Sequence, residues 1–143
     1  MSVKQISVFL ENKPGALRNM TRVLAEQQID MRAFTLAEAS DFGIARIIVD
    51  DVFATTTVLR DNGFIHSVSP VLAVALSDAP GGLYQALDAL EEAGVNVEYM
   101  YAFLGGKKEG AYMIFKVTDE KAAAQALGAK KIRLVDQEEL SEL

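Results

Sequence analysis

Apolar and polar residues alternate from Ile6 to Leu10, and a period of two predicts a strand. Pro14-Gly15 interrupts this pattern, and the apolar residues of 17–27 then recur at the spacing of one helix face. A second helix is expected from Asp50-Asp51, which are good N-caps, to about residue 60, although Thr55-Thr56-Thr57 is a poor helix-forming run. Strands are predicted at 31–39, 44–49 and 64–68.

The second half of the chain predicts the same order of elements. Strands are expected at 71–76, 95–104, 111–117 and 131–135, with a flexible loop at 105–110. Helices are expected at 83–93 and 120–127, the second beginning after Thr118 or Asp119 and ending at Gly128. The acidic residues 136–143 form either a short helix or a frayed end.

A sequence repeat underlies this common order. Asn12-Lys-Pro-Gly-Ala-Leu17 recurs 66 residues later as Asp78-Ala-Pro-Gly-Gly-Leu83, with matching apolar positions on both sides. The repeat predicts two domains, at residues 1–69 and 70–143, with the junction near Ser69-Pro70.

The order strand–helix–strand–strand–helix–strand is that of the ferredoxin-like split βαβ unit. We therefore expect an α+β fold of two ferredoxin-like βαββαβ units, each an antiparallel sheet with both helices on one face. The stretch from Tyr99 to Leu104 is apolar at successive positions, whereas a half-solvated strand alternates. Both faces of the sheet are thus expected to be covered, by the other unit or by a second chain in a homodimer.

Composition and charge narrow the possible functions. The chain has 143 residues, 50% of them hydrophobic, and a net charge of 14 − 20 = −6, with one histidine and no cysteine or tryptophan. These numbers exclude a disulfide scaffold, a thiolate metal site and a cysteine nucleophile. The negative charge argues against a nucleic-acid partner. No apolar stretch approaches a membrane span, and no signal sequence is visible, so we expect a cytoplasmic protein without a membrane partner.

The repeated Pro-Gly loop is the main candidate site. Asn12 and Asp78 each lie between a predicted strand and a predicted helix, three residues before Gly15 or Gly81. The first amides of a helix are unpaired and attract a carboxylate. The side-chain oxygen of Asn12 or Asp78 then suits an ammonium group, so that an α-amino acid fits the loop. The alternative is that both residues are ordinary helix caps in a common turn.

A second pair of polar residues occurs at equal spacing. Asp30 and Asn96 open the second strand of each unit, 18 residues after Asn12 and Asp78 respectively. Each is either a second polar contact to the ligand or a residue of a helix-to-strand turn.

These motifs resemble the ACT domain, a small amino-acid-binding regulatory module. The resemblance is carried by Asn12–Leu17 with Gln28-Ile-Asp-Met31, and by Asp78–Leu83 with Ala93-Gly-Val-Asn-Val97. It implies modules that pair edge to edge and bind an amino acid at their interface. In this chain Asn12 goes with Asp30, and Asp78 with Asn96, so each half-site is expected to hold one carboxylate. Leu10 and Leu76 stand where some members carry a histidine, which leaves the identity of the ligand open. The ligand-binding residues implied are Asn12, Pro14, Gly15, Ala16, Leu17 and Asp30 in the first unit, and Asp78, Pro80, Gly81, Gly82, Leu83 and Asn96 in the second.

The expected function is that of a non-catalytic sensor that binds an amino acid and regulates a partner enzyme of amino-acid metabolism. No cofactor, metal ion or catalytic residue is expected, and His66 is interpreted as structural. One alternative is an assembly or dimerisation module without a ligand of its own. The other is an acylphosphatase-like hydrolase, which would need an arginine where the loops hold Lys13 and Ala79.

Overall fold

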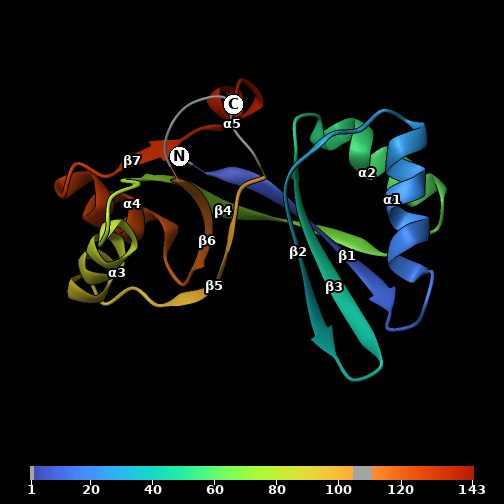
Figure 1. Cartoon of the computed structure of the whole chain (residues 1–143), viewed down its shortest axis with the longest axis horizontal. Coiled ribbons are helices and arrows are strands. Elements are labelled where there is room, and N and C mark those ends of the chain that lie inside the picture. The colour runs from blue at the N-terminus through green and yellow to red at the C-terminus, as the bar shows by residue number, and fades with distance from the viewer. Residues whose placement is uncertain (1, 105–110) are drawn as a thin grey trace. The chain divides into compact units, whose positions relative to one another are not determined.

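The computed structural model describes residues 2–104 and 111–143, which form two compact units (Figure 1). The first unit comprises Lys4–Ser69, and the second comprises Pro70–Leu143 together with the first residues of the chain. The loop predicted at 105–110 lies outside the described residues.

The first unit is an antiparallel sheet with two helices. Its sheet order is β2-β3-β1-β4, the order of a ferredoxin-like unit. Leu10 is the register partner of Gly43, and Ile6 is that of Ile47, so β1 and β3 run antiparallel over most of their length. The elements are β1 (Val3–Glu11), α1 (Ala16–Glu26), β2 (Met31–Ala39), β3 (Phe42–Val49), α2 (Val52–Asp61) and the start of β4 (His66–Leu76).

The second unit repeats this arrangement, with the order β7-β4-β6-β5. The α+β class and the ferredoxin-like plan of both units are therefore confirmed. The elements are the remainder of β4, then α3 (Gly82–Glu92), β5 (Val97–Ala102), β6 (Ala111–Val117), α4 (Glu120–Ala129), β7 (Arg133–Val135) and α5 (Gln137–Ser141).

Each unit has a hydrophobic core between its sheet and its two helices, because one face of the sheet and one stripe of each helix are apolar. In the first unit, Met20 and Leu24 of α1 and Leu59 of α2 pack against β1 and β3. In the second unit, Leu90 of α3 and Leu127 of α4 pack against β4 and β6. Both helices of a unit thus lie on one face of its sheet, as predicted.

Two predicted element boundaries are wrong. Strands were expected on either side of Ser69-Pro70, but β4 runs without a break from His66 to Leu76. Proline is tolerated in a strand at a position where no ladder bond calls for its missing N–H. Gly128 was expected to end a helix, but α4 continues to Ala129, and the left-handed residue that ends it is Lys131, with φ of 59°.

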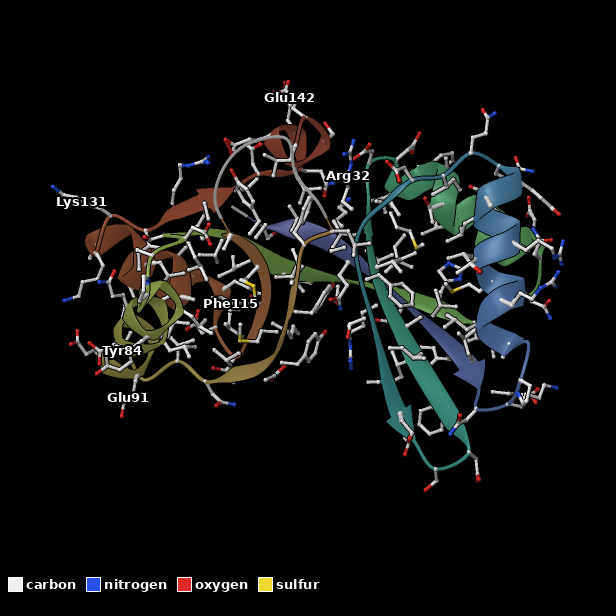
Figure 2. All side chains as sticks on the ribbon, in the orientation of Figure 1. Arg32, Tyr84, Glu91, Phe115, Lys131 and Glu142 are labelled. Carbon is white, nitrogen blue, oxygen red and sulfur yellow. The ribbon has the colours of Figure 1, made fainter. Side chains whose placement is uncertain are left out.

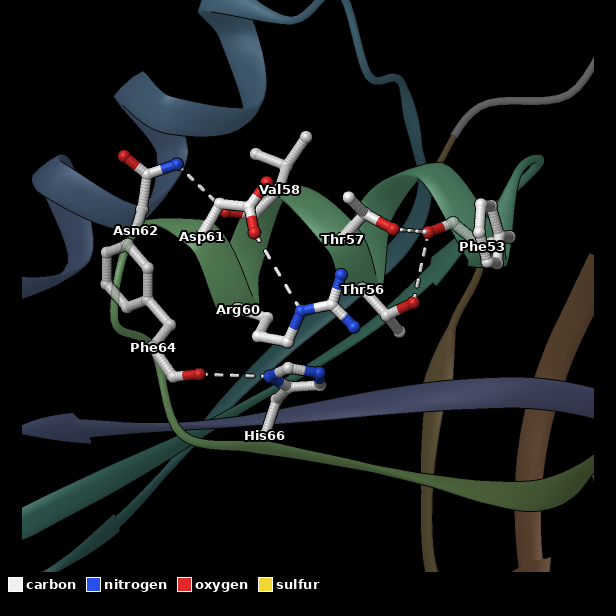
Figure 3. Close-up of polar contacts among 9 residues, drawn as sticks. All are labelled: Phe53, Thr56, Thr57, Val58, Arg60, Asp61, Asn62, Phe64 and His66. Carbon is white, nitrogen blue, oxygen red and sulfur yellow. Dashed lines mark hydrogen bonds and ion pairs between the residues drawn. The ribbon is translucent and has the colours of Figure 1, made fainter.

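Several side chains of the threonine-rich helix α2 bond its backbone. Asp51 Oδ1 accepts a hydrogen bond from Ala54 N–H at 2.9 Å, which confirms the predicted cap. The hydroxyls of Thr56 and Thr57 donate to the Phe53 carbonyl oxygen at 3.1 and 2.9 Å, as Figure 3 shows. The His66 ring binds the Phe64 carbonyl oxygen through Nδ1 at 2.9 Å, which agrees with a structural role (Figure 3).

The two units have the same backbone hydrogen bond after the C-terminal end of their first helix. Ile29 N–H donates to Leu24 O at 3.0 Å, and Val95 N–H donates to Leu90 O at 2.9 Å. The residue before each donor is left-handed, with φ of 56° at Gln28 and 71° at Gly94. The 66-residue repeat is therefore a repeat of backbone conformation as well as of sequence. Within the described ranges, no helix is both long and apolar enough to cross a membrane.

Candidate functional site

The Pro-Gly loop of the first unit joins β1 to α1. Gly15 adopts the left-handed conformation with φ of 90°, which a residue with a side chain rarely adopts. Ala16 N–H donates to Lys13 O at 3.3 Å, and Asn19 N–H donates to Gly15 O at 2.9 Å. These contacts hold the loop in a tight turn at the N-terminus of α1.

The loop of the second unit, between β4 and α3, has the same geometry. Gly81 has a φ of 92°, Gly82 N–H donates to Ala79 O at 3.2 Å, and Gln85 N–H donates to Gly81 O at 3.0 Å. One difference is steric, because a Cβ atom on Gly82 would lie 2.2 Å from the carbonyl oxygen of Ser77. The first loop carries Ala16 at the corresponding position, so the second loop lies closer to its helix.

Both loops leave a helix N-terminus open. No side chain caps α1 or α3, whereas Asp51, Asp119 and Asp136 cap α2, α4 and α5. In the part of the chain that the structure describes, no hydrogen bond engages the N–H groups at the second and third positions of α1 and α3, which are those of Leu17, Arg18, Leu83 and Tyr84. Such groups favour an anion. The alternative that Asn12 and Asp78 are helix caps is therefore wrong.

The side chain of Asn12 connects the first loop to the turn between β2 and β3. Asn12 Nδ2 donates to Ser40 O at 3.2 Å, and Asn12 N–H donates to Asp41 O at 3.1 Å. These bonds engage the backbone N–H and one side-chain N–H of Asn12, and Oδ1 remains as an acceptor. Asp78 is exposed, and among the described residues its carboxylate has no ion-pair partner.

Asp30 and Asn96 do not join the loops of their own units. Met31, the strand residue that follows Asp30, is the register partner of Val49 at one end of β3. Leu10, which leads into the Asn12 loop, is the register partner of Gly43 at the other end of β3. At about 3.4 Å per residue, this separation along the strand is roughly 20 Å. Asn96 lies similarly far from Asp78, at the end of β6 where its backbone bonds Thr118. The expectation that a loop and the strand-opening residue of the same unit form one half-site is therefore corrected by the register.

Asp30 instead lies beside an ion pair. Arg32 donates from Nε and Nη2 to the two carboxylate oxygens of Asp50, each at 2.9 Å. This bidentate bond raises the pKa of the Arg32 guanidinium, and the negative charge of Asp30 adds a smaller effect in the same direction. The carboxylate of Asp30 thus acts on a cation of its own chain.

Three cavities of the first unit share Leu10 and Glu11, the last residues of β1 before the loop. A small one of about 80 Å³ has Asn12, Leu17, Leu36 and Gly43 among its lining residues. Two larger cavities, of about 510 and 390 Å³, share Phe9, Leu10, Glu11 and Ile65. We call these four residues, together with Phe42 of the larger cavity and Lys13 of the smaller one, the β1 groove.

The β1 groove is not among the features that the sequence predicts. One signal for it exists, because Ile6, Val8 and Leu10 occupy the core-facing positions of β1 and leave Phe9 on the outward face. Phe42 belongs to β3 and Ile65 to the segment between α2 and β4, and only the fold brings them next to Phe9. The described residues contain no cluster of three or more residues that could hold a metal ion.

Known proteins that are similar to this chain point to one family. A family model described as an ACT domain pair matches residues 1–143. The crystal structure of protein BT0572 from Bacteroides thetaiotaomicron is similar, with 36% identity over 100% of this chain and 98% of that chain and a TM-score of 0.92. No match was found among curated protein sequences.

Two regulatory subunits of aspartate kinase share the fold. The subunit from Thermus thermophilus, in a ligand-free form, has 15% identity and a TM-score of 0.62. The subunit from Thermus flavus has 18% identity and a TM-score of 0.60. In both cases the match covers 88% of this chain and 90% of the other chain.

Proposed function

The chain belongs to the ACT domain family as a pair of ACT domains, and we propose that it is a non-catalytic sensor of a free amino acid. We assign the two domains to residues 1–69 and 70–143, the limits that the repeat predicts. The amino acid binds at the Pro-Gly loops, and the bound form regulates a cytoplasmic enzyme of amino-acid metabolism. The structural likeness to regulatory subunits of aspartate kinase supports a regulatory role of this type.

One observation carries the proposal. Of the five described helices, only α1 and α3 begin without a side-chain cap, and both follow the repeated Pro-Gly motif. An α-carboxylate satisfies the open N–H groups of Leu17 and Arg18, or those of Leu83 and Tyr84. The ammonium group then binds Asn12 Oδ1 in the first loop or the Asp78 carboxylate in the second.

Binding to each of the twenty amino acids, measured by isothermal titration calorimetry, tests the proposal directly. We expect heat of binding with at least one of them and a rise in melting temperature in its presence, because a ligand of the folded state stabilises it. Absence of binding by all twenty would leave the assembly module as the better interpretation. Hydrolysis of an acyl phosphate would instead support the hydrolase alternative.

We expect Asp78→Ala to weaken ligand binding at the second loop at least tenfold, which corresponds to roughly 1.4 kcal/mol. The ligand ammonium would lose its counter-charge in this variant. Glu91→Ala is the matched control, since Glu91 is an exposed acid of the same unit that lies near the far end of α3, the helix that follows the Asp78 loop (Figure 2). Unchanged affinity with reduced thermal stability would show that Asp78 is structural only.

We also propose that the chain forms a homodimer. Large apolar side chains are exposed outside the loops, among them Val68 at 45% and Leu104 at 52%. Exposed apolar surface of this kind favours protein–protein contact. Light scattering at micromolar concentration is expected to give the mass of two chains, and the mass of one chain would contradict the proposal.

A further inference from the structure

The β1 groove has an apolar floor that remains accessible. Phe9 is 40% exposed, Phe42 is 44% exposed and Ile65 is 73% exposed. Phe9 and Glu11 are two residues apart in β1 and therefore project from the same face, and Phe42 is the register partner of Glu11 in β3. Ile65 is held alongside, because Phe9 N–H donates to Ile65 O at 2.9 Å. The aromatic and aliphatic side chains thus form one surface that ends at a carboxylate.

The end of the groove that faces α1 carries two opposite charges. Lys13 Nζ lies 3.0 Å from Glu11 Oε2, and both side chains are more than half exposed. The cavity at this end is also lined by Ala16 and Asn19 of α1. An ammonium and a carboxylate held a few ångströms apart are the charge complement of the α-carbon end of an amino acid.

The second unit lacks this surface. Ala75 pairs with Arg133 where Phe9 pairs with Ile65, so a small residue and a cation replace the apolar floor. Arg133 forms an ion pair with Glu139 of α5. Ser77 and Ala79 stand 66 residues after Glu11 and Lys13, which removes the charge pair.

Each of the two loops nevertheless has one acidic residue. The first loop has an amide at Asn12 with a carboxylate at Glu11, whereas the second has a carboxylate at Asp78 with a hydroxyl at Ser77. Each loop therefore keeps one acid for an ammonium group. In the first unit this acid lies at the end of an apolar groove.

We propose that the first unit is selective for an amino acid with a large apolar side chain, which lies in the β1 groove against Phe9, Phe42 and Ile65. The ligand ammonium, which the proposed function places at Asn12 Oδ1, also binds the carboxylate of the adjacent Glu11, and the ligand carboxylate binds Lys13 together with the open N–H groups of α1. Burial of an aliphatic or aromatic side chain supplies the selectivity, because it removes apolar surface of both partners from water. This inference rests on the proposed function and specifies the ligand class of one of its two loops.

The test uses the full chain with the Asp78→Ala substitution, so that the first loop dominates the measured binding. Calorimetric titrations compare leucine and phenylalanine with glycine, serine, aspartate and lysine. We expect the two apolar amino acids to bind at least tenfold more tightly than the other four. Phe42→Ala, in the same background, is expected to lower the affinity for leucine and phenylalanine at least tenfold and to change the affinity for glycine less than threefold.

Two further variants keep the test decisive. Phe53→Ala is the matched control, because Phe53 is 82% exposed on α2 of the same unit and does not line the groove. It is expected to change no affinity. Glu11→Gln should weaken all amino acids that bind, without changing their order, and it leaves the apolar floor intact.

The outcomes separate this inference from the proposed function. If no amino acid binds the parent chain, the sensor function itself fails. If polar or charged amino acids bind the first loop as tightly as leucine, only the apolar selectivity is overturned. The same holds if Phe42→Ala dissociates a dimer and leaves the order of affinities unchanged, since a second copy of the chain then covers the groove.

Discussion

Phe115→Ala is expected to lower the free energy of unfolding by about 3–5 kcal/mol, the usual cost of removing a large aromatic side chain from a core. Phe115 is fully buried and is a register partner of Leu72 in β4 and Met100 in β5 (Figure 2). Its ring also belongs to the cluster that joins the sheet of the second unit to α3 and α4. Urea-induced unfolding, followed by circular dichroism, measures the change.

The control for this variant is Tyr84→Ala. Tyr84 is 70% exposed on α3 of the same unit, and a surface substitution of this kind usually changes stability by less than about 0.5 kcal/mol. A loss below about 1 kcal/mol for Phe115→Ala would contradict the tightly packed core described above.

Gly82→Ala is expected to destabilise the chain by about 3 kcal/mol, at the upper end of the usual range for inserting a methyl group into a packed site. The new Cβ atom would lie 2.2 Å from the Ser77 carbonyl oxygen and 3.1 Å from the Ser77 carbonyl carbon. Both are backbone atoms, so no side-chain rotation relieves the overlap, and the loop before α3 has to move. Because that loop carries Asp78, the variant should also lose ligand binding at the second unit.

Gly128→Ala makes the same chemical change at a position where the added Cβ atom has no neighbour within 4 Å. It lies in helix α4, where alanine is favoured over glycine by up to about 1 kcal/mol. The two variants should therefore shift the unfolding midpoint in opposite directions. Equal shifts would show that the loop before α3 yields more readily than its geometry indicates.

Much of the fold is predictable from the sequence because the apolar periods are clear and occur twice. The strand at 31–39 and the core-facing residues of β1 are local features, visible in the spacing of their own side chains. The continuity of β4 through Pro70 is not a local feature, because it depends on whether a neighbouring strand would need a hydrogen bond from the N–H that proline lacks. Thr55, Thr56 and Thr57 weaken a helix by propensity. Helix α2 nevertheless forms, because Asp51 caps it and Leu59 packs into the core.

The candidate site is only partly predictable from the sequence. The two Pro-Gly turns follow from local chemistry, and both have left-handed glycines as that chemistry requires. The grouping of Asp30 with Asn12 fails, because equal spacing along the chain does not reveal that the chain returns to the opposite end of the sheet before β2 begins. The β1 groove combines residues from three separate segments, and no short motif encodes such a combination.

The left-handed residues at the helix ends have a consequence for rebuilding the chain as an idealised repeat. The first unit places Gln28 and Gly63 in this conformation, and the second unit places Gly94 and Lys131 there. A side chain in this region costs on the order of 1 kcal/mol, so each natural copy carries one strained position and one relaxed one. A consensus module that takes its first-helix ending from the second copy and its second-helix ending from the first would contain neither strained residue, and would be a more robust building block than either parent.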